Sequence, residues 1–353
     1  NQGLNRAYKG SKRQPGSTFK VLAAYAPALD SCGKTLATIV RDEPYTTKSG
    51  KEIRNANRRY LGDITYRTAI ANSVNVAAVK VSDEITQELG FEYCENLGIS
   101  TLIKSKEING GIYSDINDTL ALGGITEGVY NYQMCAAFAT IANGGVYNSP
   151  TMYTKILDHD GNVLLENTQE TRTVLKDSTA ALLTSAMESV VTSGTGRSCQ
   201  LSNMPVAGKT GTTTSNKDLW FCGFTPYYTC TVWGGYDDNS ELSSTRYPKL
   251  IWKAVMSRVH ENLEYKDFTM PSGITSAVVP NSVEQKTVCT LTGKLAVAGQ
   301  CPSVTEYFAT DTAPTESCPG HAGVVGENGE AVEQPENDTN DTGDTGDTGD
   351  TGQ

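Results

Sequence analysis

A hydroxyl and an amine stand three residues apart in the tetrapeptide Ser-Thr-Phe-Lys at residues 17–20. The preceding Pro15-Gly16 pair suits the start of a helix, where side chains at i and i+3 are neighbours. A Ser hydroxyl becomes a good nucleophile when an adjacent base accepts its proton, and a buried Lys can be that base once burial lowers its pKa. The spacing therefore predicts Ser17 as a nucleophile and Lys20 as its base.

The same S-x-x-K pattern recurs at residues 31–34, so the first occurrence alone proves little. In this second copy Gly33 indicates the end of a helix, which would leave Lys34 in solvent. Two further motifs occur once each along the chain. They are Ser-Val-Asn at residues 73–75 and Lys-Thr-Gly at residues 209–211.

Each residue of these motifs also has an ordinary structural interpretation. Ser17 could cap a helix, Ser73 and Asn75 could form a turn, and Lys209 could be a solvated strand residue. Taken singly, these interpretations are preferable. Taken in order along the chain, the three motifs favour chemistry. A Lys-Ser-Gly variant at residues 48–50 precedes the S-x-N motif and is interpreted as a turn.

The order and wide spacing of the three motifs resemble the S-x-x-K, S-D-N and K-T-G set of the penicillin-recognising serine acyltransferases. The flanking residues look like the transpeptidase domain of bifunctional, class A penicillin-binding proteins, and the resemblance runs from about residue 5 to residue 260. The segments that carry it are residues 13–20, 71–75, 121–129, 142–145, 193–196, 207–213 and 218–226.

The resemblance implies a role for each matching residue. Ser17 would attack the carbonyl between the two terminal D-alanines of a peptidoglycan stem peptide, and Lys20 would take its proton. Ser73 would relay a proton to the leaving amine, and Asn75 would hold Lys20 and the substrate amide. Lys209 would keep Lys20 neutral and attract the substrate carboxylate.

The strand that begins at Lys209 is expected to bind the substrate. The hydroxyls of Thr210 and Thr212 would hold the carboxylate, and the N–H groups of Ser17 and Thr212 would form the oxyanion hole. Gly211 has no side chain, so the peptide could lie against the strand as an added strand does.

The implied activity is a D,D-transpeptidase without a cofactor or metal, acylated by β-lactam antibiotics. A D,D-carboxypeptidase and a non-catalytic penicillin sensor or scaffold are the alternatives. A class A β-lactamase is disfavoured, because it would need E-x-x-L-N and the only Leu-Asn pair, at residues 4–5, has Asn1 where the Glu should be. Val74 also replaces the Asp of S-D-N.

The pattern of elements predicts an α+β fold with helices packed on an antiparallel sheet, the penicillin-binding transpeptidase or serine β-lactamase-like fold. Helices are expected at residues 17–30, 65–87, 131–142 and 179–191, and strands at residues 206–212, 219–225 and 229–236. The family takes further strands from sequence before S-x-x-K, but only 16 residues precede Ser17. We therefore expect those strands to be missing and an open sheet edge to be covered by another segment.

The net charge of -11 is located in one segment. Nine acidic residues lie after His321, which leaves 31 acidic against 29 basic residues in a nearly neutral body. No basic stripe indicates nucleic-acid binding, and no long apolar run indicates a membrane span. We expect a transpeptidase domain at 1–262, a Cys-bearing extension at 263–321 and a disordered acidic tail with Asp-Thr-Gly repeats at 322–353.

The resemblance also implies a location and partners. The domain would act at the extracytoplasmic face of a bacterial membrane, within the cell-wall synthesis machinery. Its full-length parent would add an N-terminal anchor and a glycosyltransferase domain, both absent from this chain.

Nine cysteines cannot all pair with one another. Four are expected to be small core residues, namely Cys32, Cys94, Cys135 and Cys199. Cys222 and Cys230 could face each other across a hairpin at Pro226. His159 and His260 have charged neighbours and are interpreted as surface residues.

The remaining cysteines, Cys289, Cys301 and Cys318, form a separate group with His321. A disulfide within this trio is favoured for an extracytoplasmic protein. A structural zinc site is the alternative, although the irregular spacing does not guarantee four ligands at suitable distances.

Overall fold

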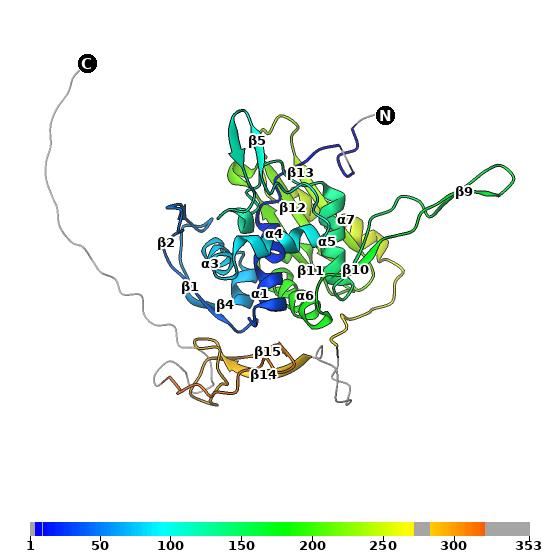
Figure 1. Cartoon of the computed structure of the whole chain (residues 1–353). Helices are drawn as coiled ribbons and strands as arrows, with labels where there is room; N and C mark the ends of the chain where they lie inside the picture. Colours follow the sequence, from blue (N-terminus) through cyan, green and yellow to red (C-terminus); the bar gives the residue numbers. More distant parts are fainter. Residues whose placement is uncertain (1–3, 9, 272–282, 322–353) are drawn as a thin grey trace, which may run out of the picture.

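The helix that starts after Pro15 forms the centre of the molecule. The computed structural model describes residues 4–8, 10–271 and 283–321, and Figure 1 shows this helical run surrounded by the other helices. It consists of the 3₁₀ turn η1 (Gly16–Thr18), the wider π-helical segment η2 (Lys20–Tyr25) and α1 (Ala26–Ser31). Every residue of η2 is fully buried, as expected for a helix enclosed on all sides.

A three-stranded antiparallel sheet lies beside this run. Its order is β11 (Ala207–Thr212), β12 (Asp218–Phe224) and β13 (Thr229–Gly235), which matches the three expected strands to within one residue at each end. Alternate residues of β12 face opposite sides. Trp220 packs into the main core, whereas Phe221 packs edge-on against Trp252 of α7 (Tyr247–Val259).

The expected helix at residues 65–87 is broken in the structure. It consists of α2 (Tyr66–Ala71) and α3 (Asn75–Ile85), and α4 (Gln87–Asn96) follows. The break contains Ser73 with φ +56°, a left-handed conformation that no helix continues through. The other helices lie where they were expected, with α5 at Asn131–Ala142 and α6 at Asp177–Thr192.

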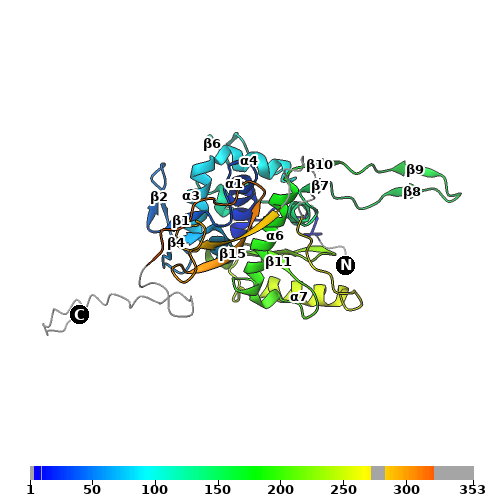
Figure 2. The same ribbon diagram turned by 90° about the horizontal axis from the view of Figure 1, so that it is seen from below.

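The body also contains short pairs of antiparallel strands. They are β1 (Ile39–Asp42) with β4 (Gly62–Thr65), β2 (Tyr45–Thr46) with β3 (Glu52–Ile53), β5 (Lys106–Ile108) with β6 (Gly111–Tyr113), β7 (Val146–Asn148) with β10 (Thr171–Thr173), and β8 (Lys155–Leu157) with β9 (Val163–Glu166). The 3₁₀ turns are η3 (Leu120–Leu122), η4 (Arg197–Cys199) and η5 (Thr214–Asn216). Figure 2 shows the β8–β9 arm projecting far from the body, and all of its strand residues are exposed.

The sheet has the expected open edge. In the part of the chain that the structure describes, no strand pairs with the outer edge of β13, and all seven β13 residues are only half-buried. The covering segment that we expected is therefore not seen among these residues.

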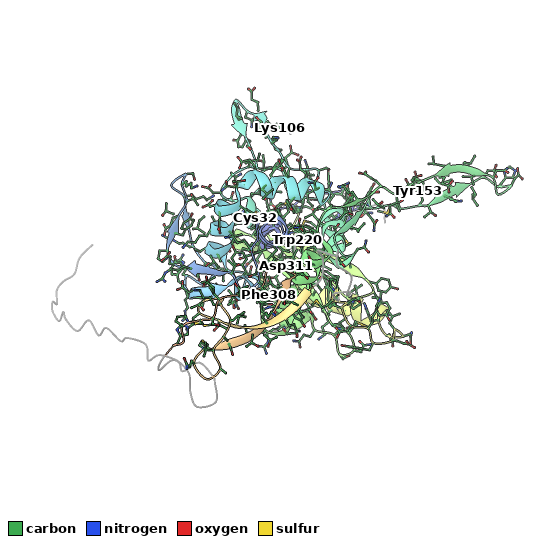
Figure 3. The ribbon with its side chains drawn as sticks, turned by 60° about the horizontal axis from the view of Figure 1, so that its bottom comes forward. Cys32, Lys106, Tyr153, Trp220, Phe308 and Asp311 are labelled. Carbon is green, nitrogen blue, oxygen red and sulfur yellow. The ribbon has the colours of Figure 1, made fainter. Side chains whose placement is uncertain are left out.

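The C-terminal extension is a second, smaller unit. Strands β14 (Val283–Cys289) and β15 (Ser303–Ala309) form a hairpin beneath the body, where Figure 3 labels Phe308. Phe308 and Val288 pack against Ala37 of the body. The expected disordered tail at 322–353 lies outside the described residues.

Several expectations about single residues are wrong. Cys222 lies opposite Thr231, so it is one position out of register with Cys230 and faces the other side of the sheet. His260 is fully buried, with Nδ1–H donating to the Met256 carbonyl at 2.7 Å and Nε2 lying 2.8 Å from the Thr225 hydroxyl.

The outcome is mixed for the other cysteines and histidines. Cys94 and Cys199 are buried as expected, whereas Cys32 and Cys135 are only partly buried. All nine cysteines are free thiols, so the disulfide expected within the C-terminal trio is absent. His159 is exposed as expected. No described helix has the length and apolar character needed to cross a membrane.

A buried ion pair holds the extension to the body. Arg67 of α2 donates from Nε to Glu306 at 2.6 Å, and its NH1 group donates to the Ser185 carbonyl of α6 at 2.9 Å. The Glu306 side chain is 1% exposed, so both carboxylate oxygens, which bind the guanidinium, are shielded from water. This pair joins β15 to two helices of the body.

Glu306→Gln removes the negative partner and leaves the Arg67 charge buried without compensation. We expect the free energy of unfolding to fall by about 3 kcal/mol or more, measured by urea denaturation. Glu284→Gln on the same hairpin is the matched control, because its pair with Lys286 is solvent-exposed and its loss should change stability little. Equal stability of the two variants would contradict the role assigned to Glu306.

Candidate active site

Three elements bring the predicted catalytic residues together. The η1–η2 run carries Ser17 and Lys20, the turn between α2 and α3 carries Ser73 and Asn75, and β11 carries Lys209. The first two segments are more than fifty residues apart in sequence, and hydrogen bonds connect them directly.

Two buried lysines meet at Ser73. Lys20 Nζ donates to Asn75 Oδ1 at 2.6 Å and to the Ser73 carbonyl at 2.5 Å, and it lies 3.2 Å from Ser73 Oγ. From the other side, Lys209 Nζ donates to Ser73 Oγ at 2.8 Å and to the Thr210 carbonyl at 3.2 Å. The Ser73 hydroxyl therefore bridges the two amines.

Burial changes the protonation of both lysines. Each is fully buried, and loss of hydration disfavours the charged form. Desolvation, together with the positive charge of Lys209, holds the pKa of Lys20 well below its ordinary value. Desolvation lowers the pKa of Lys209 to about 7. Burial thus favours the neutral form of Lys20, while at neutral pH Lys209 is divided between its charged and neutral forms.

The turn that carries Ser73 and Asn75 is held by two residues outside the motifs. Asn55 Oδ1 accepts hydrogen bonds from the backbone N–H of Asn75 at 3.0 Å and of Val76 at 3.2 Å, at the start of α3. Asn55 in turn donates from Nδ2 to the buried carboxylate of Asp42 at 2.8 Å. Sequence reasoning missed both residues, because neither stands in a motif and their proximity depends on how strand β1 lies beside the 55–61 loop.

Ser17 lies against the end of β11. Gly16 has φ +54°, and a Cβ on it would lie 3.0 Å from the Thr212 carbonyl oxygen and 3.2 Å from Thr212 N. The half-buried Ser17 hydroxyl has no hydrogen-bond partner among the described residues, because Lys20 is engaged with Ser73 and Asn75. Catalytic hydrogen bonds are often long or unformed without substrate, so this geometry is compatible with the expected role of Lys20 as the base.

Gly211 is required because β11 packs closely against the turn that carries Ser17. A Cβ on it would lie 2.6 Å from the Pro15 carbonyl oxygen and 2.9 Å from Thr18 Cγ2. The structure thus gives a reason for this glycine other than the substrate contact we expected. Trp220, labelled near the centre of Figure 3, supports the same turn, because its indole N–H donates to the Gln14 carbonyl at 2.8 Å.

An open cleft passes over these groups. Two adjoining cavities of about 610 and about 710 Å³ share Ser17, Asn75 and Thr212 in their walls. Thr210 lines the second cavity, and its hydroxyl lies 2.7 Å from that of Thr195. The arrangement can place an acyl carbonyl beside Ser17 and a carboxylate beside the hydroxyls of Thr210 and Thr212.

Among the residues that the structure describes, no group of three or more potential metal ligands lies at this cleft. Within residues 4–8, 10–271 and 283–321, the one group of His, Cys, Asp or Glu side chains close enough to share a metal ion lies in the C-terminal extension.

Comparison with known families gives two matches. Residues 3–255 match the penicillin binding protein transpeptidase domain, and residues 279–323 match the penicillin-binding protein 1A C-terminal domain. The first match agrees with the resemblance expected from the motifs, and the second overlaps the expected Cys-bearing extension.

Curated relatives are longer than this chain. Penicillin-binding protein 1A of Clostridium tetani is 33% identical over 335 residues, which are 90% of this chain and 41% of the relative. Penicillin-binding protein 1A/1B of Bacillus subtilis is 30% identical over 335 residues, which are 89% of this chain and 35% of the relative. The chain therefore spans about two fifths or less of these two proteins.

Solved structures share the fold. Penicillin-binding protein 1A from Haemophilus influenzae superposes with a TM-score of 0.72 at 23% identity, over 89% of this chain and 50% of that one. PonA1 from Mycobacterium tuberculosis in complex with penicillin V superposes with a TM-score of 0.68 at 25% identity, over 77% of this chain and 75% of that one.

The expected α+β fold is confirmed by these superpositions, and the family match extends over well more than half of the sequence. The three sequence motifs that resemble this family lie on the segments that meet at Ser73. The chain belongs to the penicillin-binding protein transpeptidase family.

Proposed function

We propose that this domain is a serine D,D-transpeptidase that cross-links peptidoglycan stem peptides through an acyl-enzyme on Ser17. The observation that carries the proposal is the buried amine of Lys20, whose pKa is well below its usual value, in the helical run that carries Ser17 into the cleft. An amine whose neutral form is favoured can accept the proton of a nearby hydroxyl.

The first step transfers an acyl group to the enzyme. Ser17 Oγ attacks the carbonyl carbon of the penultimate D-alanine, a C–O bond forms and the C–N bond to the terminal D-alanine breaks. The Ser17 proton goes to Lys20, and Ser73, which bridges both lysines, passes a proton to the leaving amine. Free D-alanine departs and an ester remains on Ser17.

The second step releases the enzyme. The amine of a neighbouring stem peptide attacks the ester carbonyl, an amide C–N bond forms and the bond to Ser17 Oγ breaks. The proton of the attacking amine returns to Ser17 through Ser73 and Lys20. The net result is one cross-link for one D-alanine released.

Binding groups lie around this path. The N–H groups of Ser17 and Thr212 would hold the oxyanion, a contact worth about 10²- to 10³-fold in rate per donor. The hydroxyls of Thr210 and Thr212, which line the cleft, would bind the terminal carboxylate of the substrate, and the buried charge of Lys209 behind Ser73 and Thr210 would attract it. Gly211 lets the nucleophile turn approach β11 closely enough for these groups to act together.

β-Lactam antibiotics are proposed to acylate the same Ser17. Support comes from the family match and from the relative PonA1, whose structure is described as a complex with penicillin V. The chain lacks the E-x-x-L-N acid of class A β-lactamases, so we propose a long-lived acyl-enzyme rather than hydrolysis.

The site residues are compatible with two alternatives. A D,D-carboxypeptidase would use the same donor site and pass the acyl group to water, whereas a sensor or scaffold would only bind. The presence of Lys20, Asn75 and Lys209 in one hydrogen-bonded cluster favours turnover. Product analysis with an added acceptor amine separates the two enzymes, because only a transpeptidase forms the new amide.

The setting of the domain is part of the proposal. Membership of the family supports action at the extracytoplasmic face of a bacterial membrane, together with other cell-wall synthesis proteins. A parent protein with an anchor and a glycosyltransferase domain is proposed on the same ground. The residue ranges of the domain, extension and tail also stay predictions.

Ser17→Ala should abolish covalent labelling by a fluorescent penicillin, because no ester can form without the hydroxyl. Gel fluorescence of the full chain is the measurement. Ser31→Ala is the matched control, since Ser31 stands in the second S-x-x-K pattern and is exposed, and it should label like the parent. Persistent labelling of Ser17→Ala would refute the assignment of the nucleophile.

The rate of acylation should fall as pH rises through about 7. The charged form of Lys209 attracts the carboxylate of the antibiotic, and its pKa in the free protein is about 7, so deprotonation removes that charge. Lys209→Arg keeps its charge throughout this range and should lose the decline, whatever its absolute rate. The second-order acylation rate measured against pH tests this, and identical profiles for the two proteins would contradict it.

A further inference from the structure

Three sulfur atoms and an imidazole converge at one end of the β14–β15 hairpin, away from the catalytic cleft. The ligand atoms of Cys289, Cys301, Cys318 and His321 all lie within 4.8 Å of one another. His321 Nε2 lies 3.2 Å from Cys289 Sγ and 3.1 Å from Cys318 Sγ. Cys318 and His321 are three residues apart in the sequence, whereas Cys301 and Cys289 precede Cys318 by 17 and 29 residues, so the fold brings the three cysteines together.

The dimensions of this cluster fit a tetrahedral ion. With metal–sulfur bonds of about 2.3 Å, the edges of a regular tetrahedron are about 3.8 Å long. The two sulfur–nitrogen separations, 3.1 and 3.2 Å, are shorter than that length, and no separation within the cluster exceeds 4.8 Å. The three cysteines are at most 2% exposed, and none of them is in a disulfide. Four ligands on one tetrahedral ion, three of them buried, leave no position open for a substrate.

Backbone hydrogen bonds fix the ligands in place. Cys289 N–H donates to the Lys294 carbonyl, and Cys318 N–H donates to the Leu295 carbonyl, both at 2.8 Å. His321 N–H donates to the Gln300 carbonyl at 2.8 Å, so all three connections lead back to the 290–302 loop.

One of the three sulfur atoms also accepts a hydrogen bond from the backbone. Val297 N–H donates to Cys301 Sγ at 3.4 Å, a contact that stabilises a thiolate. The loop therefore supplies both the position of the ligands and a hydrogen bond to one of them.

We propose that Cys289, Cys301, Cys318 and His321 bind one structural Zn²⁺ ion. Three thiols bind as thiolates and release three protons, and the neutral imidazole binds through one ring nitrogen. The Zn(Cys)₃His unit then carries one net negative charge. A tetrahedral set of three sulfurs and one nitrogen suits Zn²⁺ better than the oxygen-preferring Mg²⁺ or Ca²⁺.

The ion would fasten the extension where it meets the body. Cys289 ends β14, and the turn after it reaches the body at Gly293, where a Cβ would lie 2.6 Å from the Ala37 carbonyl oxygen. The metal ties this turn to the segment that contains Cys318 and His321, which has little regular structure of its own. Zinc binding would thus add to the folding free energy of the extension. The inference does not depend on the proposed transpeptidase activity.

The full 353-residue chain, purified without chelators, tests the proposal. Elemental analysis should find about one zinc ion per chain, and thiol titration after unfolding with a chelator should find all nine cysteines reduced. Co²⁺ in place of zinc should produce the intense thiolate-to-metal charge-transfer absorption of a cysteine-rich site. This spectrum uses the parent chain, so it does not depend on whether a variant folds.

Cys318→Ser should lower the affinity for zinc by at least about tenfold, since it removes a ligand rather than a supporting residue. Cys32→Ser is the matched control, because Cys32 is a partly buried thiol outside the cluster and should leave zinc binding unchanged.

Either of two results with the parent chain would overturn the proposal. One is a metal-free chain with seven free thiols, which would indicate a disulfide within the trio. The other is a chain with nine reduced thiols that binds neither added Zn²⁺ nor Co²⁺. Unchanged zinc affinity in Cys318→Ser would also contradict it.

Discussion

The burial of the Lys20 amine is the constraint on which the catalytic end of the molecule depends. An ammonium group loses its hydration in the core, so the neutral form is favoured there, and Lys209 adds a repulsive charge. The same burial requires polar partners, which Ser73 and Asn75 provide. The core thereby favours the neutral form of the base and fixes its position.

Much of this site was predictable because its candidate catalytic residues stand in short sequence motifs. The pairs Ser17 with Lys20 and Ser73 with Asn75 are local, and their order along the chain indicated one cleft. The support from Asn55 and Asp42 was not predictable, since it arises from a contact between segments without a motif. The break at Ser73 was also missed, because the apolar pattern of residues 65–87 continues through the turn and only the left-handed backbone interrupts the helix.

The register of the strands and the burial of side chains explain the remaining errors in the predictions from sequence. Strands β12 and β13 were located correctly, but a shift of one residue sends Cys222 and Cys230 to opposite faces, and composition does not encode that shift. His260 has charged neighbours in sequence, yet Thr225 and Met256 enclose it. The irregular spacing of the C-terminal cysteines in the sequence did not guarantee four metal ligands at suitable distances. The hairpin removes that difficulty, because pairing of β14 with β15 places Cys289 opposite Ser303, two residues from Cys301.

The six residues of α2 have a consequence for shortened versions of the protein. Arg67 near the start of this helix is neutralised by Glu306 of the extension, and the helix ends two residues before Ser73. A chain cut before Val283 would expose the face of α6 that β15 covers and leave an unmatched guanidinium less than two helical turns from the serine that bridges both lysines. The extension is therefore not a detachable appendage, and a cut meant to remove only the acidic tail belongs after His321.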